Sequence, residues 1–222
     1  MGPQNAAVGV GMRVMLLGAT GMVGGLALPM LLEDPRCRAV VAPTRRPLEL
    51  RDARLHAPVL SFDALPEAPD WAQVDAVICA LGSTMAQAGS REAFYRIDHD
   101  YPLAFARMAR TQGARAFVLN SAAGANPHSA VFYSRVKGEL ECDLRALEFA
   151  SLTLVRPGLI GGHRQQVRRG EAFALKVLGA LDPVLPRAWR INPAECIAAA
   201  LVDAALAPAP GEHVVPSRNL VG

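Results

Sequence analysis

Two residues whose side chains could do acid–base chemistry, Tyr133 and Lys137, stand four positions apart. On a helix this spacing places both side chains on one face. A phenol with a pKa of about 10 is a poor catalyst at neutral pH, but a neighbouring ammonium favours the phenolate and brings that pKa toward the working range. Ser121, twelve positions before the tyrosine, could hold a carbonyl or hydroxyl group toward it. The three residues together predict carbonyl or alcohol chemistry, whereas the pair alone could also be a packed tyrosine beside a solvated lysine.

A glycine-rich turn near the N-terminus, GATGMVG, directly follows the apolar run from Val14 to Leu17. The start of a helix carries a partial positive charge and unpaired N–H groups, so a phosphate binds there readily. In this turn Gly18 would permit a tight bend, Gly21 would let the backbone approach a pyrophosphate, and Gly24 would let the helix pack closely. We therefore expect a dinucleotide-binding turn; the alternative is an ordinary glycine-rich connection between a strand and a helix.

The residues after the second expected strand decide which dinucleotide would bind. An acidic residue there would hydrogen-bond the ribose hydroxyls of NAD(H) and repel a 2′-phosphate. This chain has Thr44, Arg45 and Arg46 instead, and an arginine fork suits a phosphate. We therefore expect NADP(H) to be preferred over NAD(H), unless the two arginines are simply solvated. Asp63, at the end of the third expected strand, could accept a hydrogen bond from the adenine amine or form a turn.

Apolar runs of strand length alternate with helix-length amphipathic segments, which is typical of βαβ units on a parallel sheet. The expected strands are Arg13–Leu17, Ala39–Ala42, Pro58–Phe62, Ala76–Ala80, Ala116–Asn120 and Leu152–Val155. The expected helices are Met22–Glu33, Glu92–Gln112, Phe132–Glu148, Glu171–Ala180 and Ala194–Ala207. The strands are apolar throughout, as expected where helices cover both faces of a sheet. We therefore predict an α/β fold, a Rossmann-like doubly wound parallel sheet with functional residues at the carboxyl ends of its strands.

Length and composition fit one folded domain. The chain has 222 residues, of which 51% are hydrophobic and 19% are charged, so it can bury a sizeable core. We expect a single NAD(P)-binding domain over residues 12–222, with a small C-terminal substrate-binding portion over about 158–222. The small and polar residues 1–11 are expected to form a flexible tail.

Charge and cysteine content argue against several other classes of protein. A net charge of +3 without a long basic run gives no sign of nucleic-acid binding. The four cysteines lie far apart and form no zinc pattern, which favours reduced thiols and no metal. No apolar run reaches the ~18 residues of a membrane span, and the N-terminus lacks the features of a secretory signal. These features predict a cytoplasmic protein with no membrane or nucleic-acid partner.

Five further segments, with the glycine turn, carry a resemblance to a known family. They are CALGST (79–84), RIDHDYPLAFA (96–106), LNSAAGAN (119–126), FYSRVKGELE (132–141) and VRPGLIGG (155–162). The set resembles the atypical short-chain dehydrogenase/reductase superfamily, in particular the small NAD(P)H-binding oxidoreductases related to the Tat-interacting tumour-suppressor protein. The G-x-x-G-x-x-G spacing of the turn is similar to that of the atypical and extended branches. The likeness covers most of residues 12–215.

The resemblance implies a Rossmann fold, NADP(H) in the crevice, and a catalytic centre of Ser121, Tyr133 and Lys137. Carried over by position, the cofactor-lining residues are Gly18, Thr20, Gly21, Met22 and Val23 at the pyrophosphate, Arg45 at the 2′-phosphate, Leu81, Gly82 and Ser83 on the adenosine side, and Pro157, Gly158 and Ile160 near the nicotinamide. The family's asparagine on the long middle helix has no clear match here. Asp98 stands in that region, so the usual proton-relay chain is not implied.

These patterns predict an NADP(H)-dependent oxidoreductase that transfers a hydride between the nicotinamide and a small carbonyl or alcohol. Tyr133 would be the acid–base group, Lys137 would tune it and bind the nicotinamide ribose, and Ser121 would orient the substrate. His163 could line the substrate pocket. The alternative is an NADPH-binding redox sensor or regulatory protein with little or no turnover. A sugar-nucleotide epimerase or dehydratase is disfavoured, because those enzymes carry a larger C-terminal region. The two long helices, over residues 92–112 and 132–148, are the expected face of a homodimer.

Overall fold

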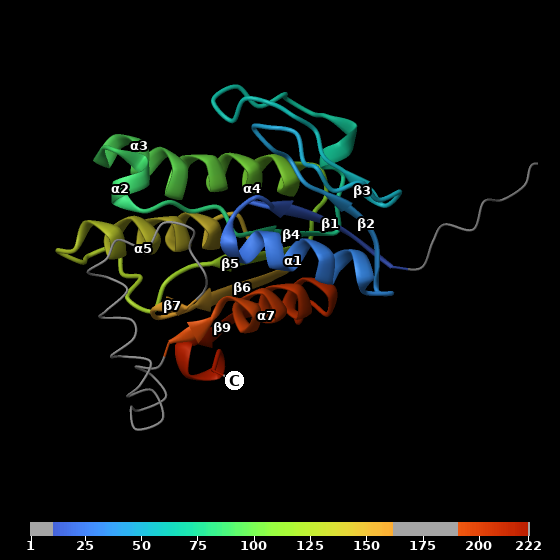
Figure 1. Cartoon of the computed structure of the whole chain (residues 1–222). Helices are drawn as coiled ribbons and strands as arrows, with labels where there is room; N and C mark the ends of the chain where they lie inside the picture. The colour runs from blue at the N-terminus through green and yellow to red at the C-terminus, as the bar shows by residue number, and fades with distance from the viewer. Residues whose placement is uncertain (1–10, 162–190, 222) are drawn as a thin grey trace, which may run out of the picture.

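The computed structural model describes residues 11–161 and 191–221. In this part the chain forms three layers, with a parallel sheet between two layers of helices (Figure 1). The strands are β1 (Met12–Leu17), β2 (Cys37–Val41), β3 (Leu55–His56), β4 (Ala76–Cys79), β5 (Ala116–Asn120), β6 (Ser151–Arg156) and β9 (Gly211–Pro216), with β7 (Ile160–Gly161) and β8 (Asn192–Pro193) forming a small second sheet. The helices are α1 (Met22–Glu33), α2 (Met85–Ala88), α3 (Arg91–Tyr95), α4 (Tyr101–Thr111), α5 (Phe132–Arg145) and α7 (Ala194–Leu206), with short turns η1 (Asp70–Ala72), η2 (Arg96–Asp100) and η4 (Ser217–Asn219).

The order of strands in the large sheet is β3-β2-β1-β4-β5-β6-β9, and every neighbouring pair is parallel. The chain builds outward from β1 to β3 and then crosses back, so that β4 pairs with the other side of β1. The carboxyl ends of β1 and β4 therefore lie side by side where the strand order reverses. Open α/β sheets bind their ligands at this point. The predicted Rossmann-like doubly wound fold is confirmed.

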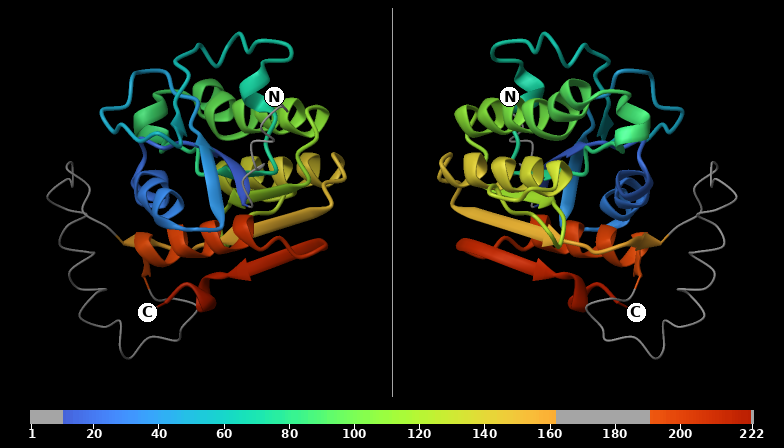
Figure 2. Two further views of the ribbon diagram at one scale, coloured as in Figure 1. Left: turned by 90° about the vertical axis from the view of Figure 1, so that its right-hand side faces the viewer. Right: turned by 90° about the vertical axis from the view of Figure 1, so that its left-hand side faces the viewer.

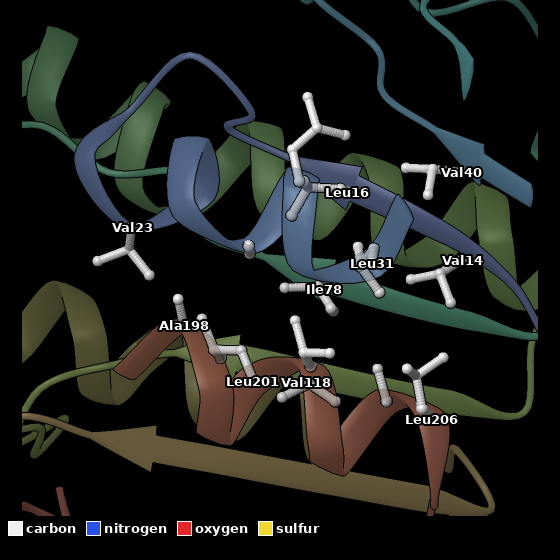
Figure 3. Packing of buried hydrophobic residues seen from close by; sticks show 14 of the residues in the cluster. Val14, Leu16, Val23, Leu31, Val40, Ile78, Val118, Ala198, Leu201 and Leu206 are labelled. Atoms are coloured by element: carbon white, nitrogen blue, oxygen red, sulfur yellow. The ribbon is translucent and has the colours of Figure 1, made fainter. Parts of the chain in front are cut away.

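Successive residues of β1 divide the core between the two faces of the sheet. Val14 and Leu16 lie in the cluster covered by α1 and α7, together with Leu201 (Figure 3). Met15 and Leu17 belong to the second cluster, which lies under α4 and α5. Figure 2 shows these two pairs of helices on opposite sides of the sheet. Because both faces are covered, the central strands are apolar throughout instead of alternating between apolar and polar residues.

Two edge strands differ from the prediction. Pairing with β2 occurs at Leu55 and His56 and not over Pro58–Phe62, where one isolated bridge joins Thr44 to Val59. Pro58 cannot donate a hydrogen bond to a neighbouring strand, which limits pairing in that segment. The sequence pattern does not predict β9, because four of its six residues are exposed and it contains no long apolar run.

The helix predicted over Glu92–Gln112 is interrupted by the π-helical turn η2 between α3 and α4. A π turn inserts an extra residue into a helix and is frequent at functional sites. Asp98 lies within this turn and is 0% exposed, which is unusual for an acidic side chain. Helix α1 has its predicted bounds, whereas α5 ends at Arg145, before Glu148, which has a left-handed φ of 52°.

Two predicted segments fall wholly or largely outside the described residues. They are the tail over residues 1–11, of which Gly11 is described, and the helix Glu171–Ala180. Within residues 11–161 and 191–221, no helix has both the length and the apolar character that crossing a membrane requires.

Candidate active site

The glycine turn joins β1 to α1, and within it the backbone packs closely against other backbone atoms. Gly18 has a φ of +84°, and a Cβ on it would lie 2.6 Å from the carbonyl oxygen of Ala80, just after β4. The amide of Gly21 donates a 2.9 Å hydrogen bond to the Gly18 oxygen. A Cβ on Gly24 would lie 2.1 Å from that same oxygen, while Thr20 is exposed. Only glycine fits at positions 18 and 24 without a shift of the backbone.

The start of α1 presents unpaired N–H groups. The first intrahelical bond runs from Gly25 to the Gly21 oxygen at 2.8 Å, so the amides of Met22, Val23 and Gly24 have no partner inside the helix. Gly21 at the N-cap offers no side-chain hydrogen bond, and the first turn holds no acid. These amides and the helix dipole fit a diphosphate. The residues present therefore fit the predicted dinucleotide at this end of the helix.

Two arginines lie just past the end of β2. Arg45 and Arg46 are exposed, and neither forms an ion pair within the described residues. The guanidinium of Arg45 lies over the ring of Phe62, 6.0 Å from its centre. Asp63 accepts a 2.7 Å hydrogen bond from the hydroxyl of Tyr101. The arginines are thus open to an anionic ligand, whereas Asp63 already has a partner in the protein.

Tyr133 and Lys137 lie one turn apart at the start of α5, in different surroundings. The Tyr133 side chain is 40% exposed, and its ring centre lies 5.8 Å from that of Phe94. Lys137 is 3% exposed, and its Nζ lies 2.8 Å from Oδ1 of Asp98. A half-exposed phenol therefore stands one helical turn from a buried ammonium at the carboxyl edge of the sheet.

Asp98 connects α5 to the loop after β4. Its Oδ2 accepts two 2.8 Å hydrogen bonds, from the backbone N–H and from the hydroxyl of Ser83. Burial acts to lower the pKa of Lys137, but the charge of Asp98 opposes it, and the net shift is upward. A Cβ on Gly82 would lie 3.3 Å from Oδ1 of Asp98. Gly82 and Ser83, predicted to border the adenosine, thus lie against Asp98. Leu81 packs against the second core cluster.

Ser121 faces a second buried carboxylate. Its hydroxyl donates a 2.5 Å hydrogen bond to Oε1 of Glu141, which is 1% exposed. Arg156, the last residue of β6, donates to the same carboxylate from Nε at 2.9 Å and from Nη2, and this contact raises the pKa of Arg156. The hydroxyl proton of Ser121 is therefore committed to Glu141, and its oxygen can serve another group only as an acceptor.

The loop after β6 is held against the same region by Asn192. The amide of Gly158 donates a 2.7 Å hydrogen bond to Oδ1 of Asn192, which is 0% exposed. The amide of Ala123, two positions after the serine, donates to the Pro157 oxygen at 2.8 Å. Ile160 follows in β7, which pairs with β8. Pro157 and Gly158 are thus fixed beside the loop that begins at the end of β5.

The sequence patterns do not single out Glu141, Arg156 or Asn192 as site residues. Glu141 carried a usable signal, because it follows Lys137 by four positions and so shares the buried face of the same helix. Asn192 carried none, since its partners are distant in the chain. His163, predicted near the substrate, lies outside the described residues.

Comparison with known proteins gives matches over most of the chain. A sequence profile for the NAD dependent epimerase/dehydratase family matches residues 14–138. The chain is 36% identical over 218 residues to protein fmp52, mitochondrial, of Aspergillus fumigatus, which covers 94% of this chain and 93% of that protein. It is 32% identical over 206 residues to protein HTATIP2 of Rattus norvegicus, covering 90% and 83%. Among solved structures, MoeE5 in complex with UDP-glucuronic acid and NAD has a TM-score of 0.70 at 16% identity, covering 92% and 76%, a likeness of fold alone.

The prediction of a cytoplasmic location is contradicted by these relatives. The protein from Aspergillus fumigatus and other fungal relatives of the same name are named as mitochondrial. Unpaired cysteines indicate a reducing compartment without saying which one, so they could not support the narrower prediction.

Proposed function

The chain belongs to the NAD dependent epimerase/dehydratase family, and on that premise we propose that it is an NADP(H)-dependent oxidoreductase. It transfers a hydride between the nicotinamide and a small carbonyl or alcohol. The predicted resemblance to atypical short-chain dehydrogenase/reductases is confirmed, while the substrate class and the choice of NADP(H) are part of this proposal. The observation that carries it is the half-exposed Tyr133 one helical turn from the buried Lys137.

The cofactor would be bound by residues at the start of α1, in the loop after β2 and on α5. The open amides of α1 would hold the diphosphate, Arg45 and Arg46 the 2′-phosphate, and Lys137 the nicotinamide ribose. Arg45 and Arg46 are exposed and have no carboxylate partner among residues 11–161 and 191–221. This supports NADP(H), because an acid at this position would repel a 2′-phosphate. When bound, the nicotinamide would supply or accept the hydride.

Proton transfer falls to Tyr133. Its hydroxyl would donate to the carbonyl oxygen during reduction and accept the proton of the alcohol during oxidation. The ammonium of Lys137 would stabilise negative charge on the phenol oxygen while the proton is away. Ser121 can accept a hydrogen bond from the substrate hydroxyl while it donates to Glu141. Donation by Ser121 to a carbonyl oxygen would require that bond to break.

A sugar-nucleotide substrate has weaker support. MoeE5, whose structure contains UDP-glucuronic acid, is longer than this chain, which covers 76% of it. A likeness at 16% identity shows the fold and carries no substrate with it.

Consumption of NADPH by the purified protein, with a panel of quinones, aldehydes and ketones, tests the proposal. We expect turnover with at least one of these classes. Tight NADPH binding by calorimetry without turnover across the panel would contradict the proposal and favour a sensor or regulatory protein. Absence of binding to both NADPH and NADH would contradict both functions.

A further inference from the structure

Lys137 is a buried lysine whose charge needs an explanation. The side chain is 3% exposed, and burial disfavours an ammonium. A lysine in such surroundings keeps its proton only if an anion lies close to it. The Oδ1 atom of Asp98 lies 2.8 Å from the ammonium nitrogen and is equally enclosed by the protein.

The ionisable groups that face Lys137 come from three elements. They are Asp98 from η2, Tyr133 from α5 and Cys79 from β4. Burial raises the pKa of the Cys79 thiol to about 11, so this group carries no charge at neutral pH. Within the described residues, the Asp98 carboxylate is therefore the group that offsets the charge of Lys137.

The position of Asp98 is fixed by the fold. The π turn η2 carries it into the interior, and the N–H and hydroxyl of Ser83 hold its Oδ2 at 2.8 Å each. These two hydrogen bonds fix the carboxylate and leave its other oxygen, Oδ1, facing Lys137. One oxygen of the carboxylate is thus held by the loop after β4, and the other contacts Lys137 on α5.

We propose that Asp98 is a positioning residue of this site, which holds Lys137 as an ammonium next to Tyr133 and so extends carbonyl reduction to higher pH. During reduction the hydride comes from the cofactor, and the proton that Tyr133 gives to the carbonyl oxygen is replaced from solvent. The site must therefore hold two protons, one on each residue of the pair. Asp98 moves the loss of the Lys137 proton to higher pH. The kinetic part of this inference rests on the proposed function, whereas the charge of Lys137 can be measured without a substrate.

The charge of Lys137 is unusually accessible to measurement, because Lys137 and Lys176 are the chain's two lysines. Nuclear magnetic resonance of isotope-labelled lysine gives two side-chain signals, which Lys176→Arg assigns. In the NADP⁺-bound protein, we expect Asp98→Asn to lower the titration midpoint of Lys137 by at least about one pH unit. An unchanged or higher midpoint overturns the proposal.

The pH profile of reduction gives a second readout. In Asp98→Asn, the alkaline limb of the profile of kcat/KM against pH should shift to lower pH by a similar amount, about one pH unit or more. The matched control is Asp100→Asn, which removes a carboxylate from the same turn. Asp100 contacts His99 at 2.9 Å instead of Lys137, so both readouts should stay at wild-type values. A limb that moves equally in both variants overturns the proposal.

Failure of the inference and failure of the proposed function are distinguishable. A fall in the Lys137 midpoint without turnover of any substrate supports the role of Asp98 and contradicts the proposed reductase. If Asp98→Asn does not fold, the titration midpoint of Lys137 in the wild-type protein tests the proposal instead. A Lys137 midpoint at or above the ordinary lysine value of about 10.4 supports the proposal, and a midpoint below it overturns it.

Discussion

Ser121 and Glu141, twenty positions apart in the chain, are joined by a 2.5 Å hydrogen bond in the protein interior. Glu141 is paired with Arg156 and also lies 3.6 Å from Arg145. The serine that the sequence predicts to orient a substrate is therefore anchored to a buried ion pair. The position of the Ser121 side chain is therefore set by the hydrogen bond to Glu141 as well as by the end of β5, which Ser121 follows.

Glu141→Gln should lower the free energy of unfolding by about 2–3 kcal/mol. Glutamine can still accept a hydrogen bond from Ser121, but it leaves the guanidinium of Arg156 without its anion. Arg156 is 27% exposed, so water compensates part of that loss. Urea unfolding measures the change. Glu148→Gln, on an exposed residue outside α5, should stay within about 0.5 kcal/mol, and equal losses in both variants would contradict the ion-pair argument.

The neighbouring glycines of α1 form a matched pair for testing the turn. In Gly24→Ala the new Cβ would lie 2.1 Å from the Gly18 oxygen, so the backbone must move, and we expect a loss of about 2–3 kcal/mol with weaker NADPH binding. In Gly25→Ala the nearest contact is the Ala19 oxygen at 3.6 Å, an ordinary distance. That variant should gain about 0.5–1 kcal/mol from helix propensity. Thermal unfolding and NADPH titration of both proteins check this, and a stable, NADPH-binding Gly24→Ala would show that the turn is looser than described.

Local pattern was enough to predict the elements that lie in the centre of the fold. Helix α1 and strand β5 have their predicted bounds, because their apolar runs end at clear turn residues. Strand β9 could not be predicted in this way, since it pairs with β6 along an exposed edge and buries little of its own surface. The π turn η2 was not predicted, because such single turns are rare and the amphipathic pattern over residues 92–112 predicts one continuous helix.

The site was predictable to the extent that its residues share one element. Tyr133 and Lys137 were found from a spacing of four on a single helix. The spacing of Glu141 from Lys137 pointed to the buried face of α5. The contacts of Asp98 with Lys137 and of Glu141 with Ser121 could be assigned only from the tertiary structure, because each joins two different elements. Pairing of buried charges is a property of the tertiary structure.

Arg45→Ala should weaken NADPH binding by about 10- to 100-fold and change NADH binding by less than about 3-fold. The guanidinium would make a charge-assisted contact with the 2′-phosphate, a group that NADH lacks. Calorimetric titration with both nucleotides measures the two affinities. Arg107→Ala, an exposed arginine on α4, should leave both unchanged. Equal affinity of the wild-type protein for NADH and NADPH, with no effect of Arg45→Ala, would remove the support for NADP(H).

Cys79 predicts a loss of stability in alkaline solution. Burial raises the pKa of its thiol from an ordinary 9.0 to about 11 in the folded protein. The unfolded chain therefore releases this proton first, so the contribution is complete below pH 9 and is lost as the pH rises to about 11. In Cys79→Ala, the free energy of unfolding should fall less steeply across this window, by up to about 1.4 kcal/mol per pH unit. Urea unfolding at several pH values gives both slopes, and parallel slopes would exclude Cys79 as the titrating group.

Tyr133→Phe should reduce turnover by at least about 100-fold while NADPH affinity and stability stay near wild type. The hydroxyl is the proposed proton donor, and the half-exposed ring loses little packing when it is removed. Tyr95→Phe is the matched control, because burial and the Glu139 carboxylate raise the pKa of Tyr95 to about 12, outside the range useful for catalysis. It should keep its turnover. The turnover rates of the wild-type protein and both variants are compared with saturating NADPH and the best substrate of the panel. Full turnover in Tyr133→Phe would mean that the proton comes from another group, and the acid–base role assigned to α5 would be lost.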